Sequence, residues 1–365
     1  MKKLMTMAAS ALLLVACGEN PGYTITGTVN NPDMNGKMVY LTPYGIPDAA
    51  ATDSAVINNG QFSMSGTQDN AQLYQLKVNT GNESERGYQT VFILENGQLQ
   101  AALDAKSSSV KGTPENDAYA SLYGQLASFD QEMEKLNADS RSEDKAIAEA
   151  AANKIDELSK QALAKITEYI KANSNKLSAA KLFVENNYEM AEEDLFAIVD
   201  KADSLFKSAP RMEKLLPVIE ARRNVAVGKK FADFEMTDMN GKTRKLSEFV
   251  GNGKIVLIDF WASWCPPCRR DMPNIVEVYK QYKNKGFEIV GVSLDSKKEA
   301  WEKGVKDLDI TWMQLSDLQG WKNAGAKLYG VNSIPHTVLV DKDGTIIAKG
   351  LHGKEIGEKL AEMLK

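Results

Sequence analysis

Two cysteines separated by two prolines, Cys265 and Cys268, are the residues of this chain best suited to chemistry. An apolar run of the β type, residues 255–260, precedes them, and apolar residues return at helical spacing after Pro273. The pattern predicts a strand, a tight turn and a helix, with both thiols at the helix N-terminus. Two thiols at this spacing can close a small disulfide reversibly, so we expect a redox centre.

The position of each thiol relative to the helix predicts its role. The thiolate is the attacking species, and lowering a cysteine pKa from about 8.5 to about 7 takes roughly 2 kcal/mol. A helix N-terminus supplies about 0.3–1 kcal/mol, or about 2 kcal/mol in a partly buried site. Cys265 precedes the helix and is expected to be the exposed nucleophile. Cys268, one turn in, is expected to be the shielded resolving thiol.

Two other uses of these cysteines are less consistent with the sequence. A structural disulfide rarely closes so small a loop. A zinc site needs four ligands, whereas the chain has three cysteines and two histidines, and Cys17 is assigned elsewhere below. We therefore predict no metal, and no cofactor other than a redox-active Cys265–Cys268 disulfide.

A resemblance to a known family is carried by three segments: IVLIDFWASWCPPCRRDMP, FADFEMTDMNGKTRKLSEFVGNGK and SIPHTVLVDKDG. They resemble the thioredoxin superfamily, and most closely its membrane-anchored periplasmic branch of TlpA- and ResA-like thiol-disulfide oxidoreductases. The resemblance covers about residues 225–365. It implies an α/β thioredoxin-like domain and an enzyme that exchanges thiols and disulfides with proteins.

The resemblance also implies roles for two residues near the cysteines. Asp259 lies in an apolar run, where an unpaired carboxylate is costly, and matches the buried aspartate beneath the thioredoxin active site. It is expected to take the proton from Cys268, the alternative being a structural carboxylate. Pro335, after Ile334, matches the family's cis-proline, which faces the cysteines and leaves a backbone edge for the substrate. The alternative is an ordinary trans peptide bond before a proline that begins a strand.

Three neighbouring positions complete the predicted site. Asp271 falls where the ResA-like branch has a glutamate near the cysteines, and a helix-surface charge is the competing interpretation. Trp264 is expected at the rim, as an apolar platform for substrates. Pro266 replaces the glycine of thioredoxin and removes an N–H group that can stabilise the thiolate. We hypothesise that Cys265 is therefore less acidic and that the pair is a reductant.

The N-terminus predicts export. Lys2 and Lys3 precede an apolar run, residues 4–15, that is too short to span a bilayer as a helix. The run ends in LVACG, which resembles the bacterial lipoprotein cleavage box and would make Cys17 a lipidated first residue. An ordinary secretory peptide is the alternative. We expect a protein anchored by lipid in the cell envelope and facing the periplasm.

The rest of the chain predicts a multidomain protein: signal peptide and lipobox 1–17, β-rich domain 18–113, helical segment 114–224 and thioredoxin-like domain 225–365. Short alternating runs separated by turn signals such as Asn35-Gly36 and Asn59-Gly60 predict an antiparallel sandwich or open barrel. This region resembles an uncharacterised β-rich domain found ahead of thioredoxin-like modules, and we expect a binding or spacer role.

Apolar stripes predict the helices of the middle segment. Ser140 and Glu143 match a capping box, and a stripe from Ile147 to Ile170 follows. Residues 195–206 form a second stripe, and Pro210 is expected to open a third helix. Between 225 and 365 the predicted elements are a hairpin at 231–246, strands at 255–260, 287–294, 310–314, 337–341 and 346–349, and helices at 265–283, 296–306, 321–329 and 354–364.

Three functions remain open on this evidence. The first is a thiol-disulfide oxidoreductase that reduces disulfide-bearing envelope proteins with electrons from a membrane thiol donor; the resemblance adds cytochrome c maturation partners. The second is a thiol peroxidase, although Ala262 stands where such sites have a threonine. The third is an envelope adaptor with a vestigial redox module. The net charge of −5 argues against nucleic acid as a partner.

Overall fold

The computed structural model describes residues 22–82 and 87–364, so the predicted lipidation site Cys17 lies outside the described residues. The chain divides after Ser128 into two compact units, which are considered one at a time below. Among the described residues, none of the helices combines the length and apolar character needed to span a membrane.

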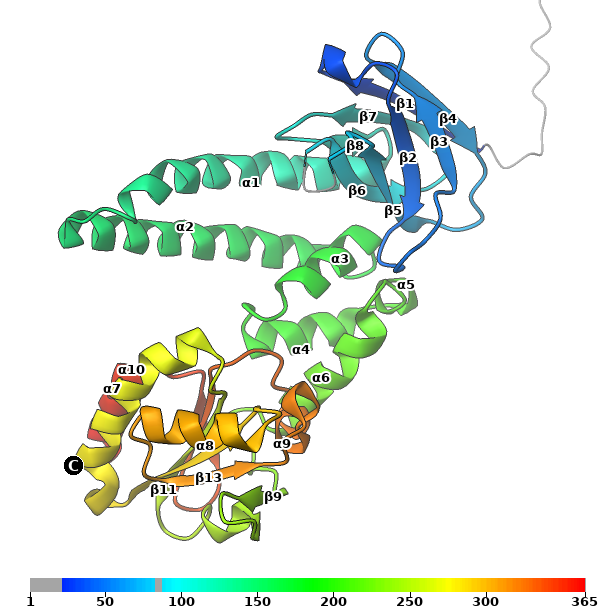
Figure 1. Ribbon diagram of the computed structural model, residues 1–365. Coiled ribbons are helices and arrows are strands. Elements are labelled where there is room, and N and C mark those ends of the chain that lie inside the picture. Colours follow the sequence, from blue (N-terminus) through cyan, green and yellow to red (C-terminus); the bar gives the residue numbers. More distant parts are fainter. Residues whose placement is uncertain (1–21, 83–86, 365) are drawn as a thin grey trace, which may run out of the picture. The chain divides into compact units, whose positions relative to one another are not determined.

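The N-terminal unit contains a β-sandwich (Figure 1). Its sheets have the strand orders β4-β1-β7-β8 and β3-β2-β5-β6. The strands are β1 (Tyr23–Val29), β2 (Met38–Pro43), β3 (Asp53–Val56), β4 (Gln61–Gly66), β5 (Gln72–Val78), β6 (Gln89–Leu94), β7 (Gly97–Leu103) and β8 (Ser109–Lys111). Alternate residues of both sheets meet in one core that includes Ile25, Leu41, Leu76 and Leu99. The predicted all-β class is confirmed.

One pairing within this sandwich was not expected. We predicted an antiparallel domain, but β1 pairs with β7 in parallel over its whole length. The strands of the other sheet separate β1 and β7 in the chain, so no hairpin turn fixes their relative direction. The short strands β3 and β8 also lack a clear alternating pattern and were not predicted.

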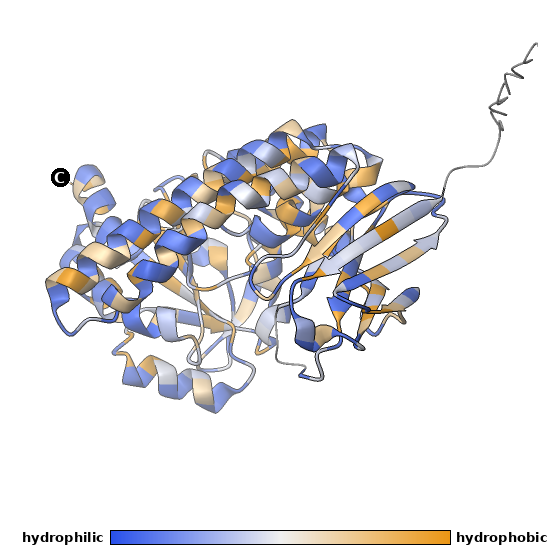
Figure 2. Ribbon diagram, turned by 90° about the horizontal axis from the view of Figure 1, so that it is seen from above, coloured by the Kyte–Doolittle hydropathy of each residue, from blue (hydrophilic) through white to orange (hydrophobic). Residues whose placement is uncertain are grey.

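The middle segment is helical, with α1 (Pro114–Asp139), α2 (Lys145–Ala172), α3 (Leu177–Asn186), α4 (Glu192–Lys201), α5 (Ser204–Lys207) and α6 (Met212–Asn224). Hydrophilic and hydrophobic residues are interleaved along these helices (Figure 2). The stripe predicted for α2 buries Ala151, Leu158 and Ile170. The stripe is thus a packing face from Ala151 onward, whereas Ile147, its predicted first member, is 48% exposed.

Three local predictions in this segment were wrong. The capping box at Ser140 does not exist: Ser140 lies just beyond α1, and the Asp144 carboxylate caps α2 by accepting from Ala146 N–H at 2.9 Å. The stripe at 195–206 is split because Asp203 begins a new short helix, α5. Helix α6 begins at Met212, after Arg211 in the left-handed region, rather than at Pro210.

The C-terminal sheet has seven strands in the order β10-β9-β13-β12-β11-β14-β15. These are β9 (Glu235–Asp238), β10 (Thr243–Lys245), β11 (Ile255–Trp261), β12 (Phe287–Ser293), β13 (Met313–Ser316), β14 (His336–Val340) and β15 (Ile346–Lys349). The helices are α7 (Pro266–Tyr282), α8 (Lys298–Asp307), α9 (Ala324–Leu328) and α10 (Gly353–Met363). The predicted order of elements and the thioredoxin-like α/β class are confirmed, with shifted element ends.

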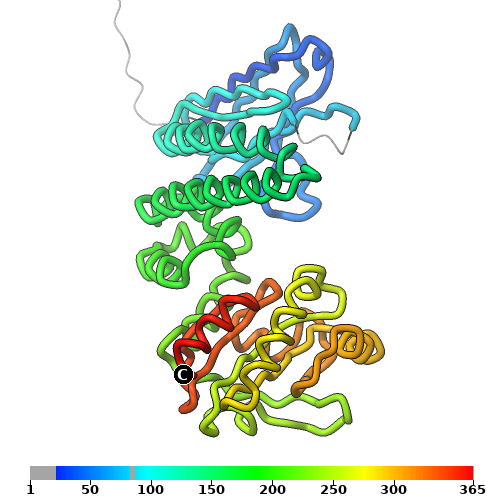
Figure 3. Tube along the Cα trace, turned by 90° about the vertical axis from the view of Figure 1, so that its left-hand side faces the viewer, coloured from blue at the N-terminus to red at the C-terminus, as the bar shows by residue number. Residues whose placement is uncertain are grey.

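Strand β11 lies inside this sheet, between β12 and β14, and positions the cysteines. All seven of its residues are buried, as expected for a strand covered on both faces. It pairs with β12 in parallel and with β14 in antiparallel orientation. Helix α7 follows β11 and lies beside α10 (Figure 3). The turn from β11 to α7 therefore lies at the end of an interior strand of the sheet.

Candidate active site

The two cysteines form a disulfide at the N-terminus of α7. Cys265 is the N-cap residue, and its Sγ accepts the backbone N–H of Cys268 at 3.2 Å. Pro266 and Pro267 occupy the first two helical positions and have no N–H group. The Cys268 amide is therefore the first N–H of the helix that can stabilise negative charge on the Cys265 sulfur.

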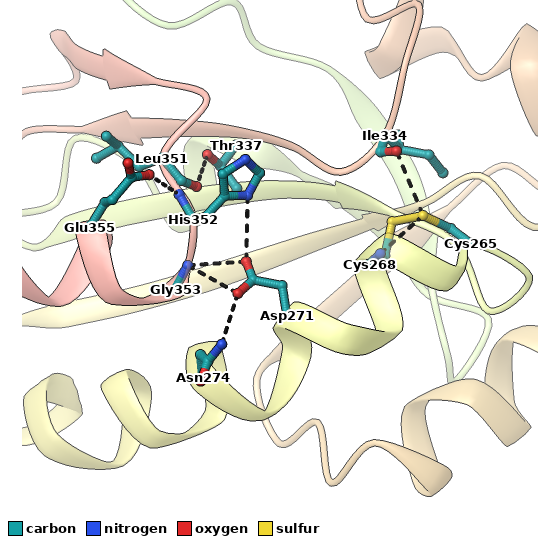
Figure 4. A network of polar contacts seen from close by, with 10 residues as sticks. All are labelled: Cys265, Cys268, Asp271, Asn274, Ile334, Thr337, Leu351, His352, Gly353 and Glu355. Carbon is teal, nitrogen blue, oxygen red and sulfur yellow. Dashed lines mark hydrogen bonds and ion pairs between the residues drawn. A yellow bond between two sulfur atoms is a disulfide. The ribbon is translucent and has the colours of Figure 1, made fainter. Parts of the chain in front are cut away.

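The expected exposure of Cys265 is wrong for this disulfide state. Cys265 is 3% exposed and Cys268 is 1% exposed, so the two residues hardly differ. The reason is the chain segment before β14: the carbonyl oxygen of Ile334 lies 3.7 Å from the Cys265 sulfur (Figure 4). The residues on either side of Cys265 in the chain, Trp264 and Pro266, are exposed.

The peptide bond between Ile334 and Pro335 is cis, which confirms this sequence prediction. Pro335 immediately precedes β14, and His336 pairs with Phe260 of β11. The antiparallel pairing of these strands brings residue 334 next to the end of β11 and so next to the disulfide. Two regions that lie about seventy residues apart in sequence thus meet at the sulfur atoms.

Asp259 lies on β11 and is 1% exposed. Its Oδ2 has no hydrogen-bond partner among the residues that the structure describes. Burial, together with the negative charge of Asp271, raises the pKa of Asp259 to about 7. Such a carboxyl group can take up or release a proton near neutral pH.

Asp271 is directed toward α10 rather than toward the sulfur atoms (Figure 4). Its carboxylate accepts the backbone N–H of Gly353 at 3.0 Å and the Asn274 side chain at 3.1 Å. His352 Nδ1 lies 3.6 Å from it. Asp271 thus caps α10 and acts on Asp259 through its charge; the catalytic role implied for it by the resemblance stays a prediction.

Trp264 is 50% exposed, as expected for a rim residue. Its ring lies 6.1 Å from the ring of Trp321, which is 49% exposed and belongs to a short 3-10 turn, residues 320–322. This contact was not predicted, because the two aromatic residues lie 57 positions apart in the sequence. Together they form an exposed apolar surface one residue away from Cys265.

Asp295, a buried carboxylate that organises the turn before Cys265, was not among the predicted site residues. Asp295 is 1% exposed and accepts the Ser263 N–H at 2.9 Å and the Ser263 hydroxyl at 2.6 Å. The Ser293 hydroxyl donates to the same carboxylate at 2.8 Å. A usable signal existed, because Asp295 directly follows the predicted strand 287–294. This strand lies parallel to β11, so the two strands end at the same edge of the sheet.

No group of three or more His, Cys, Asp or Glu side chains within residues 22–82 and 87–364 is arranged to bind a metal ion. The groups at this site that can take part in chemistry include the two sulfur atoms and the carboxyl group of Asp259. A strand, a disulfide at the start of the next helix and a cis-proline facing it define the class of thioredoxin-fold redox proteins.

Comparison with known proteins supports this class. The model of the AhpC/TSA family matches residues 227–349, and that of a domain of unknown function, DUF4369, matches residues 23–119. Thiol-disulfide oxidoreductase ResA of Bacillus thuringiensis subsp. konkukian is 37% identical over 139 residues, covering 38% of this chain and 77% of that protein. ResA of Geobacillus kaustophilus is 36% identical over 143 residues, covering 39% and 79%.

Solved structures similar to this chain include the thioredoxin domain of a thiol-disulfide oxidoreductase from Bacteroides vulgatus, at 31% identity and a TM-score of 0.36, covering 38% of this chain and 99% of that one. A thiol-disulfide oxidoreductase from Bacteroides fragilis is similar at 32% identity and 0.36, covering 37% and 100%. On the sequence relationships, this chain belongs to the ResA-like thiol-disulfide oxidoreductase family, and it is an enzyme of that class.

Proposed function

We propose that this protein is a lipid-anchored, periplasm-facing reductase of disulfides in envelope proteins, acting by exchange at Cys265 and Cys268. The observation that carries the proposal is the disulfide at the N-terminus of α7, opposite the cis peptide bond between Ile334 and Pro335. One sulfur accepts a helix N–H, and the other is enclosed one turn further along.

The reaction proceeds in two exchanges. The Cys265 thiolate attacks one sulfur of the substrate disulfide, and the other substrate sulfur leaves as a thiolate. The Cys268 thiolate then attacks the Cys265 sulfur of the mixed disulfide and releases the second substrate thiol. Two electrons pass to the substrate, and the enzyme is left with the disulfide described here. A thiol donor associated with the membrane restores the dithiol.

Asp259 takes the proton from Cys268 before the second exchange. Its carboxyl group is buried, its Oδ2 is without a partner among the described residues, and its pKa is raised to about 7 by burial and by Asp271. The paired prolines support a reducing role, since they leave only the Cys268 amide to stabilise a Cys265 thiolate. A reduction potential near about −120 mV, the value of strong periplasmic oxidants, would contradict that role.

The remaining parts of the proposal concern location and partners. The anchor is a lipid on Cys17, in the sequence LVACG. Trp264, Ile334 and Pro335 form the surface that receives the substrate, and cytochrome c maturation proteins are candidate substrates. Radiolabelled fatty acid should enter the wild-type protein in cells but not a Cys17→Ser variant; equal labelling of both would exclude this anchor.

The test of the proposed reaction is reduction of a protein disulfide by the purified chain, with dithiothreitol as electron source. We expect turnover by the wild type and none above background by Cys265→Ser. Hydrogen peroxide consumption distinguishes the peroxidase alternative: the buried Ala262 offers no hydroxyl group, and we expect little activity. An adaptor with a vestigial module would show neither reaction.

A further inference from the structure

A buried arginine from the helical segment contacts the chain segment that faces the disulfide. Arg222, near the end of α6, is 7% exposed. Its Nε donates to the carbonyl oxygen of Gly330 at 2.9 Å, and its Nη2 donates to the Asn332 side-chain oxygen at 2.5 Å. Both acceptors lie in the loop 330–335, which connects α9 to β14 and ends at the cis-proline.

The loop also packs directly on the α6 backbone. Gly330 has a φ of +62°, and a Cβ at this position would lie 2.6 Å from the Val218 carbonyl oxygen and 2.6 Å from Arg222 Cγ. Both the backbone conformation and the available space therefore require glycine. The beginning of the loop is fixed against α6 by close packing as well as by hydrogen bonds.

Two further contacts connect the same helices to the same region. The Asn332 side-chain amide donates to Asn187, the residue that ends α3, at 3.4 Å. Lys349 of β15 pairs with Glu192 of α4 at 2.5 Å, and the Lys349 side chain is 8% exposed. Since β15 pairs with β14, three helices hold the loop and the strand that follows it.

The far end of the same loop is the part that faces the sulfur atoms. The Ile334 carbonyl oxygen lies 3.7 Å from Cys265 Sγ (Figure 4). In the reduced enzyme, a backbone edge at this point can pair with an extended substrate chain, as edges of sheets do in peptide recognition. One end of a six-residue loop is therefore held by Arg222, while the other end borders the reacting sulfur.

We propose that Arg222 is a positioning residue for substrate: it fixes the loop 330–335 so that the backbone at Ile334 receives the substrate chain beside Cys265. On this account the side chain of Arg222, from α6, is part of the substrate-binding machinery. The inference rests on the proposed exchange at Cys265 and extends it to a region outside the thioredoxin-like domain predicted from sequence.

The test compares two adjacent arginines of α6 in the full chain. Arg222→Lys keeps the positive charge. The planar guanidinium group donates from two nitrogens to Gly330 and to Asn332, and a single ammonium group cannot reproduce this arrangement. For a protein substrate we expect KM to rise about tenfold with kcat changed less than about twofold, since substrate positioning and not sulfur chemistry is lost. A small aromatic disulfide does not span the loop. With this substrate, the KM of the Arg222→Lys variant should rise much less than it does with the protein substrate.

Arg223→Gln is the matched control. Arg223 follows Arg222 in α6, but its guanidinium pairs with Asp200 at 2.8 Å and lies over the Phe196 ring, both within the helical segment. This variant removes contacts within the helical segment and none with the loop 330–335, so it should keep the wild-type KM. Equal increases in KM for both variants, or an unchanged KM in Arg222→Lys, would overturn the proposal.

Two additional measurements keep the result interpretable. Asn332→Ala removes one acceptor of Arg222 at an exposed position and should raise KM by a smaller factor, even if the Arg222 variant folds poorly. Amide hydrogen exchange at residues 330–334 should be faster in Arg222→Lys than in Arg223→Gln. This readout does not require activity, so it decides the positioning claim even if the wild type reduces no disulfide.

Discussion

The β-sandwich and the thioredoxin-like domain differ in what they bury. Within described residues 22–82 and 87–111, no charged side chain is buried, and alternating apolar residues account for the core. The thioredoxin-like domain buries the carboxyl groups of Asp238, Asp259 and Asp295 along with its apolar residues. Burying a carboxyl group costs free energy unless it is hydrogen-bonded, and of these three only Asp259 has a buried oxygen without a partner among the described residues.

The largest expected effect is on the pH dependence of stability. Two buried groups of the thioredoxin-like domain, Asp259 and His336, change the free energy of unfolding in opposite directions as the pH rises. Folded Asp259 keeps its proton up to about pH 7, whereas the unfolded carboxyl loses it near pH 3.8. Relative to an Asp259→Asn variant, the wild type should therefore lose stability as pH rises from 4 to 7, by at most about 4 kcal/mol. Urea denaturation at a series of pH values measures this difference.

His336 supplies the opposite case. Burial, with the charges of Lys349 and Arg222, lowers the pKa of His336 to about 3, whereas the unfolded imidazole takes up a proton near pH 6.5. Relative to His336→Asn, the wild type should lose stability as pH falls below 6.5. If the free energy of unfolding of the wild type, of Asp259→Asn and of His336→Asn varied with pH in the same way, neither Asp259 nor His336 would be held in its neutral form.

The second prediction concerns the rate of exchange. Asp259→Asn should slow the resolution of a mixed disulfide by about a hundredfold, the lower range for general acid–base catalysis. The wild-type rate should rise with pH through about 7 as the carboxyl ionises, and the variant should lack that ionisation. Stopped-flow measurement of thiol release follows this step. An unchanged rate and pH profile in the variant would refute the role of Asp259.

The third prediction concerns Asp295. Asp295→Ala leaves the Ser263 amide and hydroxyl without their acceptor and should lower the free energy of unfolding by about 1–3 kcal/mol. Because Ser263 lies two residues before Cys265, turnover should also fall severalfold. Thermal unfolding and disulfide reduction check the two effects. Wild-type values for both would mean that the turn before Cys265 does not need this carboxylate.

The smallest effect is expected in the β-sandwich. A cavity of about 900 Å³ on its surface is lined by apolar residues such as Val56 and Phe62, by neutral polar residues and by Lys111. Lys111→Ala should leave kcat/KM for a protein disulfide within about twofold of the wild type, as for surface substitutions in general. A tenfold lower kcat/KM would contradict this expectation, because it would mean that the β-sandwich takes part in the exchange reaction.

Local patterns allowed much of the C-terminal fold to be predicted. The β11–α7 unit follows from periodicity and from prolines at the start of a helix, and the cis bond before Pro335 was implied by family resemblance. What the sequence could not provide was long-range pairing. The parallel contact of β1 with β7 and the burial of Cys265 by Ile334 join distant segments.

The same limitation explains the residues that were missed. Asp295 acts through Ser263, and Arg222 acts through a loop more than 100 positions away. The position of Asp295 directly after a predicted strand gave a signal that could have been used, whereas nothing in the sequence around Arg222 indicates its partner. The wrong capping box is a different kind of error: Ser140 and Asp144 both fit local capping rules, and only the path of the chain after α1 selects Asp144.

The most direct test of the central claim is to trap the mixed disulfide. The full-length Cys268→Ser variant, reduced and then exposed to a protein that carries one accessible disulfide, should form a covalent one-to-one adduct. Mass spectrometry after proteolysis should locate that bond at Cys265 and not at Cys17, and dithiothreitol should release the partner. Absence of any adduct at Cys265, under conditions in which the wild type is fully reduced, would contradict the account.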